Sequence, residues 1–229
     1  MKNQLKIIAH IETDFKTKFG IPRQSGLVDL EALIIFEPEY RNDDALRGIE
    51  DFSHLWLIWN FSKAQRHTWS PTVRPPRLGG NKRIGVFATR SPFRPNPIGL
   101  SSVKLLGKVK TPNQGTALRV SGADLMNGTP IYDIKPYLAY TDSHPDAIGG
   151  FADKKLNDSL EVEFPPDLLK IIPENKQNAL LELLSEDPRP HYISDNNRIY
   201  GFEFSDFEIK FKVEDGLLTV VELNIIKKA

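Results

Sequence analysis

The chain has 229 residues, no cysteine, and 30 basic residues balanced by 30 acidic ones. Its length suits one large domain or two small ones with a substantial core. No run approaches the roughly 20 apolar residues of a membrane helix, and the first residues lack the apolar core of a signal peptide. The missing cysteines exclude disulfides, thiolate nucleophiles and iron–sulfur clusters, which suits a reducing cytoplasm.

The charges are segregated along the chain. Residues 52–123 contain no Asp or Glu but twelve Lys or Arg, so the rest of the chain carries 18 basic and 30 acidic residues. Such a block usually marks an anionic partner, although a basic face paired with the acidic remainder in a dimer is the simpler alternative. Trp69, Phe87 and Phe93 stand among the basic residues. Because aromatic faces near cations hold unstacked bases, the pattern favours nucleic acid.

The first part of the chain predicts strands joined by turns. Apolar residues predict strands over 5–11 and 27–36, separated by a turn that contains Pro22-Arg23-Gln24. This tripeptide offers a carbonyl, a cation and an amide to a ligand, or is simply an exposed loop. Residues 41–49 predict a short helix. The aromatic and branched residues of 52–61 suit a central strand of a barrel or sandwich.

A basic hairpin follows a long loop. Residues 62–81 predict that loop, and residues 84–88 predict a strand that leads into a turn stiffened by three prolines. A second strand starts near Ile98. The bend between Arg90 and Arg94 can bring both guanidinium groups to one face. The alternative is a proline-rich turn with two solvated arginines.

A second polar stretch follows two further strands, predicted over 98–109 and 116–125. Asn127-Gly128 is typical of a tight turn. Alternation after this turn places Asp133 and Lys135 on one face of a strand. These two residues are either a functional pair or a surface ion pair.

The periodic pattern dissolves between residues 141 and 160, which predicts a domain junction. We therefore expect an N-terminal domain over 1–143, a linker over 144–160 and a small α+β domain over 161–229. The small domain is predicted to contain one helix, over 173–186, and an antiparallel meander. Its three strands are expected over 198–204, 206–213 and 217–226.

Several common sites are absent from the sequence. There is no G-x-G-x-x-G, no G-x-x-x-x-G-K-[ST] and no G-x-S-x-G, which leaves dinucleotide, triphosphate-cradle and acyl-transfer sites unsupported. The five histidines show no metal-ligand spacing, so we expect no metal. His54 is interpreted as a core histidine that hydrogen-bonds a backbone carbonyl.

Three segments resemble the TrmO (TsaA-like) tRNA methyltransferase family. They are Gly20-Ile21-Pro22-Arg23-Gln24, residues 87–101 (FATRSPFRPNPIGLS) and residues 128–137 (GTPIYDIKPY). The resemblance spans about residues 5–143. Asp187-Pro188-Arg189-Pro190 and Tyr200-Gly201 are similar to the C-terminal domain of bacterial members. One position departs from the family pattern, because Asn127 stands where an Asp is expected before Gly-Thr-Pro.

This resemblance implies a fold and an activity. The fold is mainly β, with an antiparallel β-barrel as the N-terminal domain. The activity is S-adenosylmethionine-dependent methylation of the exocyclic 6-amine of threonylcarbamoyl-adenosine, beside the anticodon of tRNA. The resemblance further implies a cytoplasmic homodimer with its cofactor near the subunit interface.

Carried over residue by residue, the resemblance implies a cofactor site formed by Pro22, Arg23, Gln24, His54, Leu55, Arg90, Leu100, Asn127, Gly128, Thr129 and Pro130. Our hypothesis for catalysis is that Asp133 takes or orients the proton of the amine, while Lys135 and Tyr140 position the modified base. Six basic residues are predicted to bind the phosphates of tRNA: Arg66, Arg74, Arg77, Lys82, Arg83 and Arg94.

Two other functions fit the sequence. A non-enzymatic RNA-binding β-barrel would need only the acid-free residues 52–123, here called the basic window, and the aromatic residues within it. Such a protein would have no affinity for S-adenosylmethionine. A methyltransferase for a small molecule or a protein would make the basic window incidental, and would turn over without tRNA.

Overall fold

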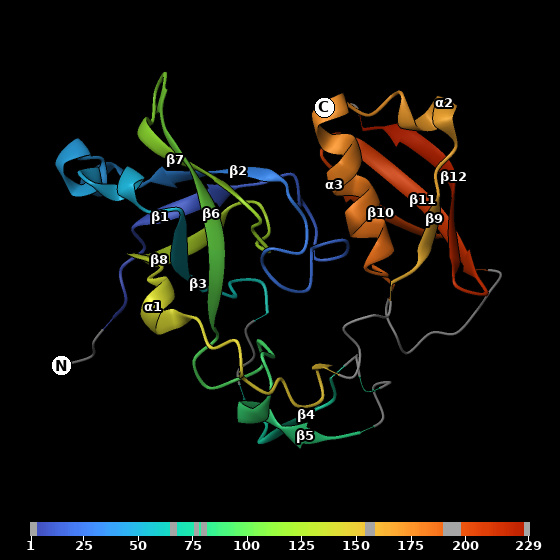
Figure 1. Ribbon diagram of the computed structural model, residues 1–229, viewed down its shortest axis with the longest axis horizontal. Helices are drawn as coiled ribbons and strands as arrows, with labels where there is room; N and C mark the ends of the chain where they lie inside the picture. The colour runs from blue at the N-terminus through green and yellow to red at the C-terminus, as the bar shows by residue number, and fades with distance from the viewer. Residues whose placement is uncertain are drawn as a thin grey trace.

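The computed structural model describes residues 4–64, 68–75, 78, 82–153, 159–189 and 198–226. The chain is mainly β, as the sequence predicts, and its strands form a larger body and a smaller one (Figure 1). Among the helices of the described residues, none is long and apolar enough to cross a membrane.

The larger body is a ring of six antiparallel strands. In order around the ring they are β1 (Ala9–Glu12), β2 (Glu31–Phe36), β7 (Gly115–Ser121), β6 (Ile98–Thr111), β3 (His54–Asn60) and β8 (Thr129–Pro136). The ring closes into a barrel because β8 also pairs with β1, with Ile131 opposite Ala9. The strands predicted over 5–11 and 27–36 begin later in the structure, at Ala9 and at Glu31.

Alternate side chains of the strands point inward and fill the barrel. In β3, Leu55, Leu57 and Trp59 are buried, whereas the residues between them are partly exposed on the outer surface. Side chains from the other strands, such as Ile34 and Ile131, complete the same core. A fully buried core of this kind gives a rigid frame whose loops can carry a site.

A small ribbon projects from the barrel between β3 and β6. It consists of β4 (Thr72–Val73) and β5 (Ile84–Gly85), followed by a 3₁₀ helix over Val86–Ala88. The predicted strand over 84–88 is thus only two residues long, because the backbone turns where the Val86 side chain becomes buried. The predicted helix over 41–49 is also shorter, a 3₁₀ helix over Asp43–Leu46.

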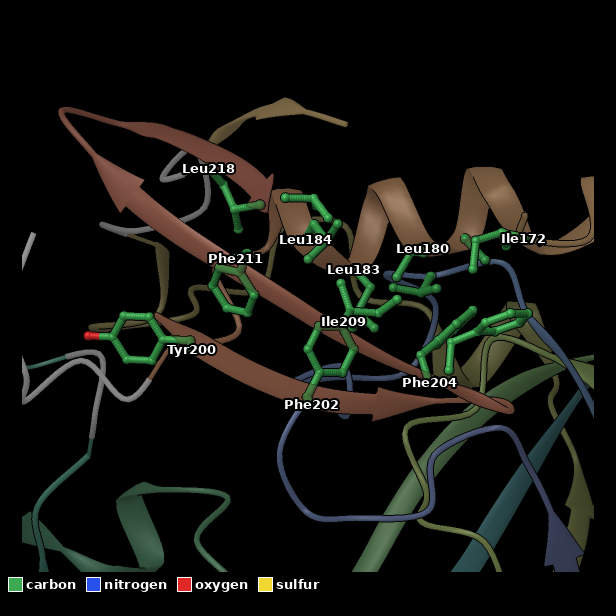
Figure 2. Close-up of a cluster of buried hydrophobic side chains, with 14 of the residues drawn as sticks. Ile172, Leu180, Leu183, Leu184, Tyr200, Phe202, Phe204, Ile209, Phe211 and Leu218 are labelled. Atoms are coloured by element: carbon green, nitrogen blue, oxygen red, sulfur yellow. The ribbon is translucent and has the colours of Figure 1, made fainter. Parts of the chain in front are cut away.

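The smaller body is a helix on a four-stranded sheet. The sheet order is β10 (Tyr200–Phe204), β11 (Phe207–Glu214), β12 (Leu217–Ile225) and β9 (Glu161–Glu163). Figure 2 shows Leu180, Leu183 and Leu184 of α3 (Glu174–Ser185) facing aromatic side chains of the sheet. The meander and the helix are confirmed. The parallel strand β9 and the short helix α2 (Pro166–Leu169) were not predicted, since three or four residues are too few to show a period.

The loop between β1 and β2 joins the two bodies. Phe15, Val28 and Leu30 of this loop belong to the core of the smaller body. A partly buried ion pair, with 2.7 Å between Lys176 Nζ and Asp14 Oδ2, fastens the start of the loop. The segment with the Pro-Arg-Gln bend is therefore held against two rigid bodies rather than left as an exposed loop.

Candidate functional site

A cavity of about 690 Å³ lies where β3 ends and β6 begins, under the loop between β1 and β2. Its volume is typical of a small-molecule site. Residues from five separate segments line it: Lys18, Ile21, Pro22, Arg23, Gln24 and Ser25; Trp56, Trp59, Asn60, Phe61, Ser62, Lys63 and Ala64; Thr89, Arg90, Pro92 and Arg94; Ile98, Gly99, Leu100 and Ser102; and Asp124, Met126 and Thr129.

The hairpin arginine meets the Pro-Arg-Gln bend in this cavity. Arg90 Nη1 donates a hydrogen bond to Gln24 Oε1, and Gln24 Nε2 donates to the carbonyl of Arg23 at 2.5 Å. Arg23 Nη2 donates to the carbonyl of Asp187 in the smaller body, also at 2.5 Å. The bend is thus fixed from both sides, and it holds the Arg90 guanidinium at the cavity wall.

A half-buried carboxylate, that of Asp124, lines the cavity. Trp59 Nε1 donates to Ser101 Oγ at 2.9 Å, and Ser101 Oγ donates to Asp124 Oδ1 at 2.5 Å. Burial raises the pKa of the Asp124 carboxyl above its ordinary value, and the Ser101 hydrogen bond and the Arg90 charge offset this only in part. A carboxylate in this state is a stronger base than a solvated one.

Asp124 was not among the site residues predicted from the sequence. The available signal was its position as the first acidic residue after the acid-free window of 52–123. A single Asp at the end of a predicted strand is not distinctive by itself. Only the pairing of β6 with β7 and the return of the chain toward Ser101 show that this carboxyl is enclosed.

Gly99 makes room for the Trp59 ring at the cavity wall. A Cβ at this position would lie 2.2 Å from the indole. We predict that Gly99→Ala lowers the free energy of unfolding by about 1–3 kcal/mol, since the indole would have to shift away from its hydrogen bond to Ser101 to admit the methyl group. Urea unfolding measures this. The matched control is Gly85→Ala, where a Cβ would meet nothing within 4 Å; equal losses in both variants would contradict the prediction.

Six of the residues assigned to the cofactor line this cavity: Pro22, Arg23, Gln24, Arg90, Leu100 and Thr129. Asn127 and Gly128 line a separate hollow of about 330 Å³, beside His10 and Glu37. Asn127 Oδ1 accepts a hydrogen bond from the Thr13 backbone N–H at 3.1 Å. An asparagine supplies this acceptor as well as an aspartate does, so the departure at this position keeps the turn anchored. Pro130 lies on β8 opposite His10 and does not line the main cavity.

His54 and Leu55 do not line the cavity, although Trp56, the next residue of β3, does. Leu55 is fully buried in the barrel. The interpretation of His54 as a core histidine is wrong, because its ring is exposed and lies 2.9 Å from Ser53 Oγ. Asn60, Ser62 and Lys63 stand at the cavity instead.

The three residues assigned to catalysis lie on the outer surface. Lys135 Nζ lies 2.9 Å from Asp133 Oδ2, with side chains 62% and 46% exposed. Tyr140 is 88% exposed on α1 (Ala139–Asp142). None of the three lines the cavity. Asp133 and Lys135 do share a strand face, as the alternation predicted, but it is the face that points away from the barrel core.

The basic window separates into two parts. Lys108, Lys110 and Arg119 form ion pairs with carboxylates on the far side of the barrel. Within the described part of the chain, no carboxylate forms an ion pair with the basic residues Arg74, Lys82, Arg83 and Arg94. The unneutralised charge therefore gathers at the ribbon and at the cavity. Arg66 and Arg77, also assigned to tRNA, lie outside the described residues.

The fold is a β-barrel with a cavity at one end, whose wall carries Arg90 and Asp124. Residues 10–143 match the family model of the tRNA-methyltransferase O N-terminal domain, and residues 157–226 match that of the TrmO C-terminal domain. The chain belongs to the TrmO family.

Relatives and solved structures agree with this assignment. The chain is 41% identical to the Escherichia coli tRNA (adenine(37)-N6)-methyltransferase, over 96% of this chain and 97% of that protein. It is 37% identical to a Methanothermobacter thermautotrophicus protein named "Probable S-adenosyl-L-methionine-binding protein", over 62% of this chain and 96% of that one. A crystal structure of TrmO from Pseudomonas aeruginosa superposes with a TM-score of 0.78 at 32% identity, covering 98% of both chains.

Proposed function

We propose that this chain is an S-adenosylmethionine-dependent tRNA (adenine(37)-N6)-methyltransferase, acting on threonylcarbamoyl-adenosine beside the anticodon. The observation that carries the proposal is the convergence of Arg90, Gln24 and Asp124 on one cavity. The activity named for the Escherichia coli relative, which matches over nearly the whole of both chains, gives the reaction. S-adenosylmethionine supplies an electrophilic methyl group when it is bound.

The cavity residues fit this cofactor. Its carboxylate requires a cation, which Arg90 provides at the cavity wall. Its sulfonium prefers an aromatic face or a carbonyl dipole. Trp59 and Phe61, whose ring centroids are 4.2 Å apart, give such faces. Amide and backbone groups of the Pro-Arg-Gln bend supply hydrogen bonds for an adenine.

Asp124 is our assignment for the proton acceptor. The attacking nitrogen loses a proton as it forms its bond to the methyl carbon, and the electron pair of the broken carbon–sulfur bond stays on sulfur. Among the residues that line the described cavity, Asp124 is the one carboxylate. Its raised pKa makes it a better acceptor for that proton, and Ser101 orients it.

Asp133 is the competing candidate from the sequence. Its ion pair with Lys135 and its exposure favour a role at the surface, such as contact with RNA. We propose that Lys135 and Tyr140 contact the RNA outside the cavity rather than the reacting atoms.

The proposal includes a domain organisation. We assign the antiparallel barrel, within residues 1–143, to methyl transfer, and the small α+β domain, within 161–229, to a supporting role, with a linker over 144–160. A homodimer and a cytoplasmic location, where tRNA is modified, follow from the family resemblance and are part of the same proposal.

Phosphate contacts make activity depend on salt. Arg74, Lys82, Arg83 and Arg94 carry charge that no described carboxylate neutralises. We predict that raising the salt concentration from about 50 to 200 mM lowers kcat/KM for tRNA by at least about tenfold, through counterion release. The control is the affinity for S-adenosylmethionine, measured by calorimetry over the same range. An unchanged kcat/KM would contradict the assignment to phosphates.

Mass spectrometry of nucleosides tests the proposed function. The protein is incubated with cofactor and with tRNA that carries threonylcarbamoyl-adenosine, or with tRNA that has unmodified adenosine at the same position. A mass increase of one methyl group on the modified nucleoside alone is the expected result. Binding of tRNA without methylation and without affinity for the cofactor would instead indicate an RNA-binding barrel. Turnover without tRNA would indicate another substrate.

A further inference from the structure

The ribbon next to the cavity presents two aromatic side chains to solvent. Trp69 is 54% exposed and Phe87 is 72% exposed. Their ring centroids lie 6.2 Å apart, with 29° between the ring planes. Large aromatic side chains seldom stand exposed in pairs without a binding role. Neither ring lines the cavity, and the cofactor site leaves this pair unexplained.

The ribbon holds the pair in place. Thr72 pairs with Gly85, and the Val86 backbone N–H donates to the Pro71 carbonyl at 2.9 Å. The buried Val86 side chain anchors the 3₁₀ helix that carries Phe87. These contacts keep the two rings adjacent although they are 18 positions apart in the sequence. The backbone that carries the two rings is therefore ordered before a ligand contacts them.

The surroundings of the pair are cationic. Arg83 Nε donates to Thr72 Oγ1 at 2.7 Å, which places its guanidinium along the ribbon beside Ser70 and Thr72. No ion pair with a carboxylate of the described residues involves Arg74, Lys82 or Arg83. Aromatic faces combined with unneutralised cations are the elements with which proteins bind single-stranded nucleic acid.

We propose that Trp69 and Phe87 form a stacking platform for an unpaired base of an RNA loop. The platform rests on the proposed function for its partner, a tRNA loop. Phe87 is two positions before Thr89, which lines the cavity, so their Cα atoms lie within about 7 Å of each other. The stacked base is therefore a near neighbour of the nucleotide that enters the cavity. Figure 1 shows the ribbon as a projection from the barrel.

Charge argues against a second copy of this chain as the occupant. A symmetric dimer centred on the ribbon would bring Arg74, Lys82 and Arg83 close to the same three residues of its copy. Like charges placed opposite one another in an interface are unfavourable, whereas RNA phosphates neutralise them.

The test is RNA binding by the full-length protein. Fluorescence anisotropy measures affinity for a labelled stem-loop RNA with an unpaired seven-base loop, and for a blunt duplex RNA of equal length. We expect Trp69→Ala and Phe87→Ala each to weaken stem-loop binding about tenfold, and duplex binding less than twofold, because paired bases are already stacked. Phe87→Trp should bind like wild type, whereas Phe87→Leu, which keeps apolar area without a π face, should bind like Phe87→Ala. Leu5→Ala, which removes a side chain 56% exposed outside the ribbon, is the matched control.

Each of the following outcomes would contradict the proposal that Trp69 and Phe87 stack on an unpaired base. Equal losses for stem-loop and duplex would mean a charge or folding effect, and unchanged affinity in both alanine variants would mean no stacking. A change of oligomeric state in Trp69→Ala, measured by light scattering, would assign the pair to a protein interface. Methylation separates this proposal from the proposed function. Wild-type activity retained in Phe87→Ala at low tRNA concentration would refute only the platform, whereas an inactive wild type that still shows the stem-loop losses would refute only the function.

Discussion

Replacing Asp124 by asparagine is expected to lower the single-turnover rate of methyl transfer by about a hundredfold or more, which is the usual contribution of a positioned proton acceptor. Asparagine keeps the shape of the side chain and can still accept the Ser101 hydrogen bond, but it cannot accept a proton. Rapid quenching with saturating cofactor and enzyme in excess over tRNA measures this rate. The affinity for S-adenosylmethionine should change less than threefold.

The pH dependence of the same variant gives a second readout. Asp124 acts as a base only when ionised, so the wild-type rate should rise with pH through the raised pKa of this carboxyl, and this limb should be absent in Asp124→Asn. Because the folded protein binds this proton more tightly than the unfolded chain does, the carboxyl stabilises the fold below its ordinary pKa, near 3.8, and that stabilisation is lost as pH rises through the raised value. Asp124→Asn should therefore melt no lower than wild type at pH 7, with the difference shrinking toward pH 4.

The control for Asp124 is the same change at Asp133, which carries an exposed ion pair. We expect Asp133→Asn to transfer methyl groups within about threefold of wild type under single-turnover conditions. If Asp133→Asn instead shows the hundredfold loss and Asp124→Asn does not, the proton acceptor is the outer carboxylate and our reassignment is wrong.

Removing the Arg90 guanidinium is expected to weaken binding of S-adenosylmethionine by about 10- to 150-fold, the range for a hydrogen bond to a charged group of about 1.5–3 kcal/mol. The residue lines the cavity and is held there by Gln24. Isothermal titration calorimetry on Arg90→Ala measures the loss. The same variant should move the rising limb of the pH–rate profile upward, since the Arg90 charge lowers the pKa of Asp124.

Arg47→Ala is the matched control for Arg90, because it removes an arginine whose side chain is 81% exposed and pairs only with the neighbouring Asp44 among the described carboxylates. Its cofactor affinity should equal that of wild type. Arg90→Lys should recover only part of the affinity, since an ammonium lacks the planar, two-pronged geometry of a guanidinium. Wild-type affinity in Arg90→Ala would remove this residue from the cofactor site.

The sequence predicts the longer strands of the barrel well, because β3, β6 and β7 have seven residues or more and show alternation between a buried and an exposed face. The limits come from tertiary contacts. The short strand β5 ends where Val86 turns inward, and β9 is only three residues long. Periodicity in the sequence predicts neither the end of β5 nor the existence of β9, since both depend on the tertiary contacts of these segments.

The residues of the candidate site that belong to loop motifs could be predicted from the sequence. The residue whose role depends on its burial could not. Gln24 and Arg90 were found from the Pro-Arg-Gln bend and the proline-stiffened hairpin, and they do meet in the cavity. Asp133 was assigned to the proton without Asp124 being considered; its alternation with Lys135 was predicted correctly, but it turns that pair outward. Enclosure of Asp124 depends on Ser101 and Trp59, which are distant in sequence.

The most direct test of the account is a crystal structure of the protein with S-adenosylhomocysteine, the product form of the cofactor. We predict that it occupies the 690 Å³ cavity, with its carboxylate at Arg90 and its sulfur facing the space beside Asp124. Density for it in the smaller hollow beside His10 and Glu37, or elsewhere on the barrel, would contradict the account.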